Sequence, residues 1–290
     1  MDIILTGLAR SGTTLCCHLL NKLPGSVALL EPMDPAQLAG SSDRVFLKRV
    51  RQFYSQQRLN LWRNQTAISK ANNAGVIPDN SFGSFLTLGG RRRCLAEVRH
   101  VNFKPLPDKK FRLIIKHPSM FTAKLGVLAS RYPCYAIIRN PLALLLSWSS
   151  VDAHIADGHV PMAEIFDDRL RTMLSAEPDR ISRQLIILSY FCDAYQRYLT
   201  PERILRYEGL IASGGRVLST IDPSACRLEE SFQQRNTNPM YERSNVEPLT
   251  ERLLMDQGAW RSFYRDDDIV QLCRSWLAEP SSPSLAASSV

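Results

Sequence analysis

The sequence predicts an α/β fold in which a parallel β-sheet is flanked by helices. Five short apolar runs alternate with helical segments at the spacing of β–α–β units, which favours a parallel sheet covered on both faces. A composition of 44% hydrophobic and 22% charged residues is ordinary for a globular chain of 290 residues. We expect one domain over residues 1–277, with a mostly helical C-terminal part. The Ser-, Pro- and Ala-rich tail, residues 278–290, is expected to be disordered.

The expected strands are the apolar runs at residues 2–6, 26–30, 111–116, 134–138 and 203–207. Apolar residues at helical spacing predict helices at residues 16–23, 44–63, 120–131, 141–151, 162–200 (with a break at 177–178), 250–264 and 267–277. Pro141 suits the first position of its helix, and Asn140 can cap that helix. Residues 64–90 are rich in Asn, Gly and Ser, so we expect an irregular segment that could cover a substrate. Residues 233–248 are expected to form a polar loop.

A glycine-bracketed loop joins the first strand to the first helix, in the sequence Gly-Leu-Ala-Arg-Ser-Gly-Thr-Thr-Leu over residues 7–15. Backbone N–H groups and the positive end of the helix would face a phosphate there, which makes the fold P-loop-like. The Gly7-x4-Gly12 spacing matches a P-loop, but Thr13 stands where P-loop NTPases have lysine. A cation lies inside the loop instead, at Arg10. The simpler alternative is a tight strand-to-helix turn without a ligand.

Charge and cysteine content narrow the classes of partner. A net charge of +8 suggests an anionic ligand. The short Arg91-Arg92-Arg93 run has no interleaved aromatic residues, so we expect no nucleic acid partner. Seven cysteines without a C-x2-C pair indicate reduced thiols and no metal site. The first strand begins at residue 2 and no stretch approaches the ~18 apolar residues of a membrane span, so we expect a cytoplasmic protein.

Polar residues follow four of the predicted strands, and in a parallel sheet such positions meet at one edge. They are Arg10 to Thr14, Glu31, Lys116 with His117, and Arg139 with Ser147 eight residues further on. Two phosphate cradles, each with an arginine and a hydroxyl, would suit a ligand with phosphates at two ends, such as 3′-phosphoadenosine 5′-phosphosulfate (PAPS). Each group also has a simpler interpretation. Glu31 could be a solvated loop acid, and Ser147 a buried helical serine bonded to a carbonyl.

Four segments of the sequence resemble motifs of the PAPS-dependent sulfotransferases. The segment 7–15 resembles their 5′-phosphosulfate loop. Residues 138–148, from Ile-Arg-Asn-Pro to Ser-Trp, resemble their 3′-phosphate motif with the same arginine-to-serine spacing. Residues 206–210 (Arg-Tyr-Glu-Gly-Leu) are similar to an R-Y-E-x-L strand end, and residues 116–118 (Lys-His-Pro) to a K-x-P element of the carbohydrate, heparan-type branch. Together these segments span residues 3–210 in the order of the family.

The resemblance implies transfer of a sulfuryl group from PAPS, leaving 3′-phosphoadenosine 5′-phosphate (PAP). The acceptor would be a hydroxyl or amine of a carbohydrate or other small metabolite, and the in-line displacement would need no metal. It implies a cofactor site made of Arg10, Ser11, Gly12, Thr13, Thr14, Leu15, Arg139, Ser147 and Tyr207. Arg139 would grip the 3′-phosphate as a bidentate fork.

For catalysis the resemblance implies Glu31 as the base and Lys116 beside the sulfuryl oxygens, with Arg10 stabilising charge on the transferring group. His117 is the reserve base or a structural hydrogen bonder. The sequence departs from many cytosolic family members, which have lysine at the position of Arg10 and a stacking tryptophan at that of Leu15. Tyr207 and Trp148 are the two candidates to contact the adenine instead.

Two other functions stay open. One is a P-loop-like nucleotide-binding kinase or NTPase with a degenerate loop, against which the missing lysine and the absence of an obvious aspartate-bearing strand end argue. The other is a non-catalytic binder of acidic polymers. The identity of the acceptor and the oligomeric state are not encoded in any motif that we recognise.

Overall fold

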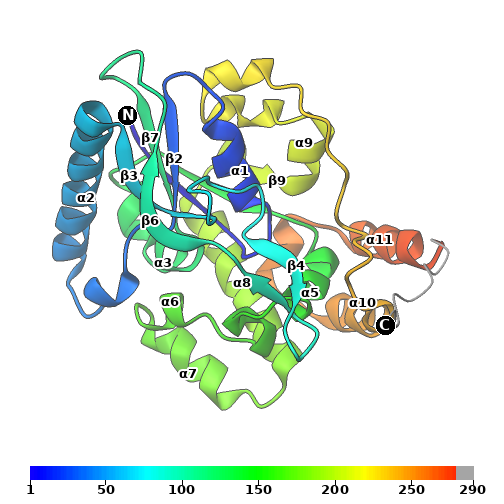
Figure 1. The fold of residues 1–290 in the computed structure, drawn as a ribbon. Coiled ribbons are helices and arrows are strands. Elements are labelled where there is room, and N and C mark those ends of the chain that lie inside the picture. Colours follow the sequence, from blue (N-terminus) through cyan, green and yellow to red (C-terminus); the bar gives the residue numbers. More distant parts are fainter. Residues whose placement is uncertain (279–290) are drawn as a thin grey trace.

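A five-stranded parallel sheet lies at the centre of the computed structural model, which describes residues 1–278 (Figure 1). Its order is β2-β7-β1-β8-β9, and every neighbouring pair is parallel. The strands are β1 (Asp2–Gly7), β2 (Ser26–Leu30), β7 (Arg112–Lys116), β8 (Cys134–Ile138) and β9 (Ile204–Arg206). Each lies within one residue of its predicted bounds, so the predicted α/β class is confirmed.

Both faces of this sheet are buried, because alternate side chains of each strand enter two different hydrophobic clusters. Ile4 belongs to the larger cluster, and its neighbours Ile3 and Leu5 belong to the smaller one. The larger cluster is covered by α2 (Asp43–Asn64), α3 (Pro118–Ala123), α4 (Leu125–Ala129), α5 (Pro141–Ser149) and α8 (Arg180–Tyr198). The smaller is covered by α1 (Thr13–Leu20) and α9 (Tyr207–Ala212). The strands therefore read as continuous apolar runs rather than as alternating ones.

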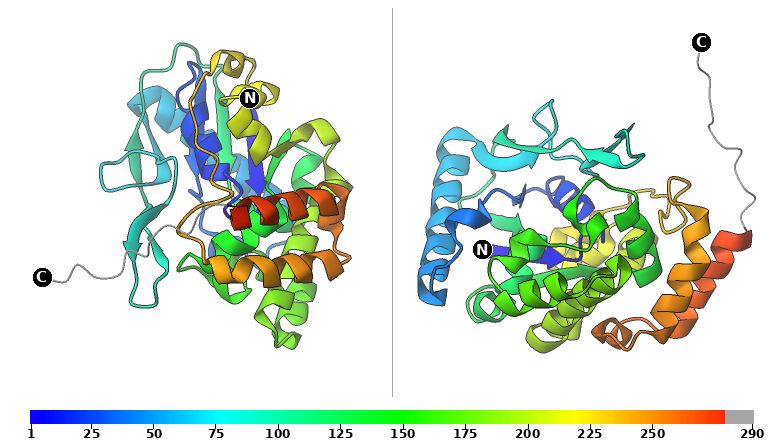
Figure 2. Two further views of the ribbon diagram at one scale, coloured as in Figure 1. Left: turned by 90° about the vertical axis from the view of Figure 1, so that its right-hand side faces the viewer. Right: turned by 90° about the horizontal axis from the view of Figure 1, so that it is seen from below.

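The C-terminal part is mostly helical, as predicted, with α6 (Pro161–Glu164), α7 (Asp168–Ala176), α8, α10 (Val246–Met255) and α11 (Asp266–Ala278). The predicted break at 177–178 separates α7 from α8, whose cap Asp179 accepts from the Ser182 N–H. Figure 2 shows α10 and α11 packed together at one end of the molecule. Apart from Ala278, the predicted tail lies outside the described residues.

Several predicted helix bounds were wrong. The segment 120–131 forms two short helices that begin earlier, at Pro118. The segment 250–264 forms α10, which starts at Val246 inside the predicted loop, and a separate 3-10 turn at Ala259–Ser262. Apolar spacing alone locates the middle of a helix better than its ends.

The largest correction concerns residues 64–90, which are not irregular throughout. β3 (Thr66–Ala71) pairs antiparallel with β6 (Glu97–Asn102), and β4 (Phe82–Leu86) pairs with β5 (Arg92–Cys94). β3 buries every second residue, but these are Ala67, Ser69 and Ala71. Such small side chains do not form an alternating apolar pattern, so the sequence gives no hydrophobic signal for this strand. The segment before β4 and strand β5 bring polar side chains to the carboxyl edge of the central sheet, among them Asn80, Ser81 and Arg92.

No helix among residues 1–278 is long and apolar enough to cross a membrane.

Candidate functional site

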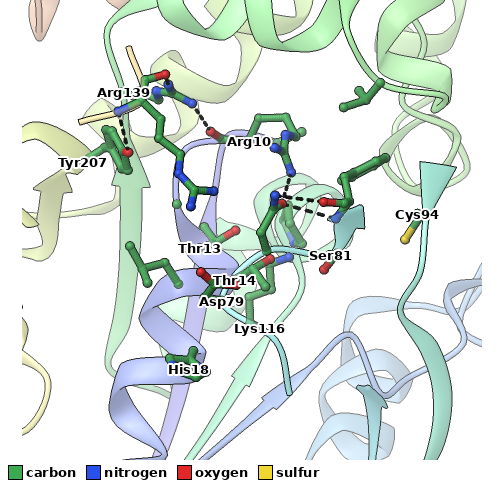
Figure 3. Close-up of a pocket in the computed structure, with 18 of the residues that line it drawn as sticks. Arg10, Thr13, Thr14, His18, Asp79, Ser81, Cys94, Lys116, Arg139 and Tyr207 are labelled. Atoms are coloured by element: carbon green, nitrogen blue, oxygen red, sulfur yellow. Dashed lines mark hydrogen bonds between the residues drawn. The ribbon is translucent and has the colours of Figure 1, made fainter. Parts of the chain in front are cut away.

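A cleft of about 880 Å³ opens at the carboxyl edge of the sheet. Its volume falls within the ~300–1,000 Å³ of typical ligand pockets. Most of the residues proposed from the sequence line it together: Arg10, Gly12, Thr13, Thr14, Leu15, Glu31, Lys116, His117, Arg139 and Tyr207. Figure 3 shows Arg10, Thr13, Thr14, Lys116, Arg139 and Tyr207 around this cleft. Ser11 and Ser147 are not among the lining residues, and both are fully buried. Ser11 donates to the Ile137 carbonyl at 2.8 Å, which is a structural role.

The glycine-bracketed loop requires its glycines. A Cβ at Gly7 would lie 2.5 Å from the Ile137 carbonyl oxygen, and one at Gly12 would lie 2.7 Å from the Tyr207 ring. Both have positive φ, and Arg10 between them also has a left-handed backbone, with φ 68°. No side chain caps the N-terminus of α1. Its first-turn N–H groups have no acceptor within the helix, so this end is suited to hold an anion.

The Arg10 side chain crosses the cleft toward α5. Its Nε donates to the Ser147 hydroxyl at 3.3 Å and its Nη1 to Asn80 Oδ1 at 2.9 Å. The guanidinium also lies over the Phe82 ring, at 4.7 Å from the centroid. Burial lowers the pKa of Arg10 to about 10, so this side chain stays cationic at neutral pH. The two cradles that the sequence suggested as separate are therefore in contact through Arg10.

Arg139 uses most of its hydrogen-bonding capacity within the protein. Its Nε donates to Asn236 Oδ1 at 2.8 Å and its Nη1 to the Arg10 carbonyl at 3.0 Å. Its Nη2 donates to the Arg235 carbonyl at 2.5 Å and to the Tyr241 hydroxyl at 3.4 Å. A guanidinium has five N–H donors, so a single donor remains. In this arrangement Arg139 cannot present the bidentate fork that the resemblance implies.

Glu31 is held between two lysines and is not a solvated loop acid. Its Oε1 accepts from Lys116 Nζ and its Oε2 from Lys70 Nζ, both at 2.6 Å. Burial on its own would raise the pKa of Glu31, but the charges of Lys116 and Lys70 outweigh burial and hold this pKa well below its usual value. The group is an ionised carboxylate, and it is a weak proton acceptor for as long as both lysines hold it.

His117 has a structural hydrogen bond. Its Nε2 accepts from the Met33 N–H at 3.1 Å, and its ring packs edge-on against Phe121 at 5.1 Å between centroids. Burial lowers the pKa of His117 to about 3. The lone pair that a base would use is occupied, so this geometry favours the structural alternative over a reserve base.

This role of His117 gives a pH-dependent prediction. The unfolded chain takes up a proton on this histidine near its ordinary pKa of about 6.5, whereas the folded state resists it until about pH 3. The free energy of unfolding should therefore fall as the pH drops below about 6.5, by up to about 1.4 kcal/mol per pH unit from this group. In His117→Gln this contribution is absent, so the dependence on pH between 7 and 5 should be shallower in urea unfolding. An unchanged slope in His117→Gln would contradict this effect of burial, and a large loss of turnover in the folded variant would favour a catalytic role.

Sequence reasoning missed several residues of the cleft, among them Lys70, Asn80, Arg92, Arg235 and Tyr241. Lys70 and Asn80 come from the segment 64–90 that was expected to be irregular, and Arg92 lies just beyond it, at the start of β5. Small buried residues and partly exposed residues alternate along β3, and this alternation is the signal that could have located Lys70. Among the described residues there is no group of three or more His, Cys, Asp and Glu side chains that could hold a metal ion.

Fold and site together define an α/β protein with a cleft at the carboxyl edge of its sheet that is lined by more cationic than anionic side chains. No protein-family model matches the chain, and no curated protein matches it. Among solved structures, the chain is similar to the crystal structure of a sulfotransferase from Mycobacterium tuberculosis. The two are 15% identical, the match covers 87% of this chain and 75% of that one, and the TM-score is 0.33. A likeness at this distance does not assign an activity, so the function is inferred from the site itself.

Proposed function

We propose that this protein transfers a sulfuryl group from PAPS to a hydroxyl or amine of a small-molecule or glycan acceptor. The observation that carries this proposal is that one cleft contains the uncapped start of α1, the ion pair of Lys116 with Glu31 and the arginines of the two motifs. These donors suit the phosphate and sulfate oxygens of such a cofactor. The resemblance of residues 7–15 and 138–148 to the cofactor motifs of sulfotransferases supports the same conclusion.

Each side chain then has a distinct task. The N–H groups of Gly12, Thr13 and Thr14 would hold the 5′ end of the cofactor at the start of α1. PAPS supplies an activated sulfuryl group, whose bond to the 5′-phosphate oxygen breaks as the acceptor oxygen or nitrogen bonds to sulfur. Lys116 would neutralise charge that develops on the transferring group. Glu31 would accept the acceptor proton once Lys116 turns from its Oε1 toward the sulfuryl oxygens.

Calorimetric titration with PAP, ADP and ATP in the absence of magnesium tests the cofactor. We expect PAP to bind at least tenfold more tightly than ADP, a difference of about 1.4 kcal/mol, because only PAP carries the 3′-phosphate. Equal affinity for PAP and ADP would contradict the proposal. ATP binding that depends on magnesium would favour a kinase or NTPase. If the protein binds acidic polymers with an affinity that falls steeply as the salt concentration rises, and does not bind PAP, a non-catalytic binder would be favoured.

A further inference from the structure

Four arginines line the cleft together with Tyr241, whose hydroxyl accepts from Arg139 Nη2 at 3.4 Å. They come from four separate segments and are Arg10, Arg92, Arg139 and Arg235. Within residues 1–278, no ion pair involves any of these four side chains. Burial acts to raise the pKa of Tyr241, yet the charge of Arg139 and the neighbouring donors lower it overall. Four cationic side chains that lack an ion-pair partner among the described residues and line the same cleft favour the binding of a multiply charged anion.

Arg92 is the member of this cluster whose Nε is buried without a hydrogen-bond partner among the described residues. Its side chain is 3% exposed, and its Nη2 donates to the Ser150 hydroxyl at 2.7 Å. Arg92 nevertheless lines the cleft. An unsatisfied buried donor of this kind is unfavourable, and a ligand in the cleft would satisfy it.

The backbone places Arg92 in this position. Its N–H donates to the Ser150 carbonyl at 3.0 Å, and its carbonyl accepts from the Asp152 N–H at 2.9 Å. β5 is thereby attached to the end of α5. Among the three consecutive arginines only Arg92 is buried. Arg91 pairs with Asp157 on the outside, and Arg93 is exposed.

We propose that Arg92 and Tyr241 complete the subsite for a phosphate monoester, the 3′-phosphate of the cofactor. This inference rests on the proposed function. Arg139 has one donor left and Ser147 is buried beneath Arg10, so these two motif residues cannot grip the phosphate by themselves in the present arrangement. Arg92 supplies the missing guanidinium donor. A phosphate monoester carries about −1.5 to −2 charges at neutral pH, which the unpaired arginines of this cluster would balance.

Titration of PAP against 5′-AMP, which lacks the 3′-phosphate, tests this assignment directly. In Arg92→Gln we expect affinity for PAP to fall at least ~10-fold while affinity for 5′-AMP stays near wild type, as expected for loss of a charge-assisted contact. Arg93→Gln is the matched control, since it removes one arginine from the same strand at an exposed position. In this control the PAP to 5′-AMP affinity ratio should be unchanged.

Failure of this inference can be told from failure of the proposed function. Wild-type protein without preference for PAP over 5′-AMP would overturn both. A wild-type preference that Arg92→Gln retains would overturn the role of Arg92 alone. If circular dichroism shows that Arg92→Gln is unfolded, Arg92→Lys is used for the test instead. This variant keeps the positive charge but loses the planar guanidinium. An unchanged affinity ratio in Arg92→Lys would overturn the assignment, and a reduced one supports it. In Tyr241→Phe, a reduced ratio of PAP affinity to 5′-AMP affinity would support a contact between the Tyr241 hydroxyl and the phosphate. An unchanged ratio would reject that contact.

Discussion

Replacing Lys116 with methionine is expected to lower kcat by about 10²–10³-fold and to leave PAP affinity close to wild type. Lys116 is 4% exposed and is the last residue of β7, and it lines the same cleft as the start of α1, where the sulfuryl group would be held. Binding of the nucleotide would rest on the N–H groups of the loop and on the arginine cluster instead. Steady-state sulfuryl transfer and PAP calorimetry on the same preparation measure the two quantities separately.

Lys70→Met is the matched control for this variant, because Lys70 and Lys116 bind different oxygens of the same carboxylate at the same distance, 2.6 Å. Each substitution removes one cation from Glu31. If Lys116 stabilises charge on the transferring group, its loss should be far more damaging than the loss of Lys70. Equal losses in both variants would mean that Lys116 acts only through Glu31, and the role proposed for it would be rejected.

Glu31→Gln is expected to keep PAP binding and to lose turnover by about 10²–10⁴-fold, because an amide cannot take up the acceptor proton. The substitution also leaves Lys116 and Lys70 without their anion, so rates are to be compared well below the unfolding temperature of the variant. A nearly normal rate with the fold intact would reject Glu31 as the base.

The pH dependence of this carboxylate has a definite sign. The lysines hold the pKa of Glu31 below its usual value against the opposing effect of burial, so its ionised form persists to unusually acidic pH. Activity should therefore persist until the pH falls through that lowered pKa. The stability contributed by the ion pairs is full above the pKa of the unfolded chain and is lost progressively as the pH falls from there through the lowered pKa. Lys70→Met removes one of the two cations, so the acid limb of the kcat profile should move to higher pH. An acid limb at the same position in both proteins would show that another group controls it.

Much of the fold could be predicted from the sequence, because its signals are local. The five central strands are apolar runs bounded by turn residues, and the cap of α5 is encoded by Asn140, whose side chain accepts from the Leu142 N–H. The antiparallel strands were missed because the buried positions of β3 carry small residues, including Ser69. The bond from the Leu30 N–H to the Ser69 hydroxyl attaches β3 to β2, and no local pattern reveals such a contact.

In the candidate site, too, some features follow from local sequence and others depend on the tertiary structure. The sequence by itself determined the glycine loop, the strand ends and the polar residues that follow them, since these depend on backbone sterics and on runs of a few residues. Only the tertiary structure decided how those residues are paired. Glu31 meets Lys116 across 85 positions and Arg139 meets Asn236 across 97, while Arg10 reaches Ser147 across 137. The partners of a charged side chain depend on which distant segments the fold places within about 3 Å of it, and hydrogen bonding acts over no greater range.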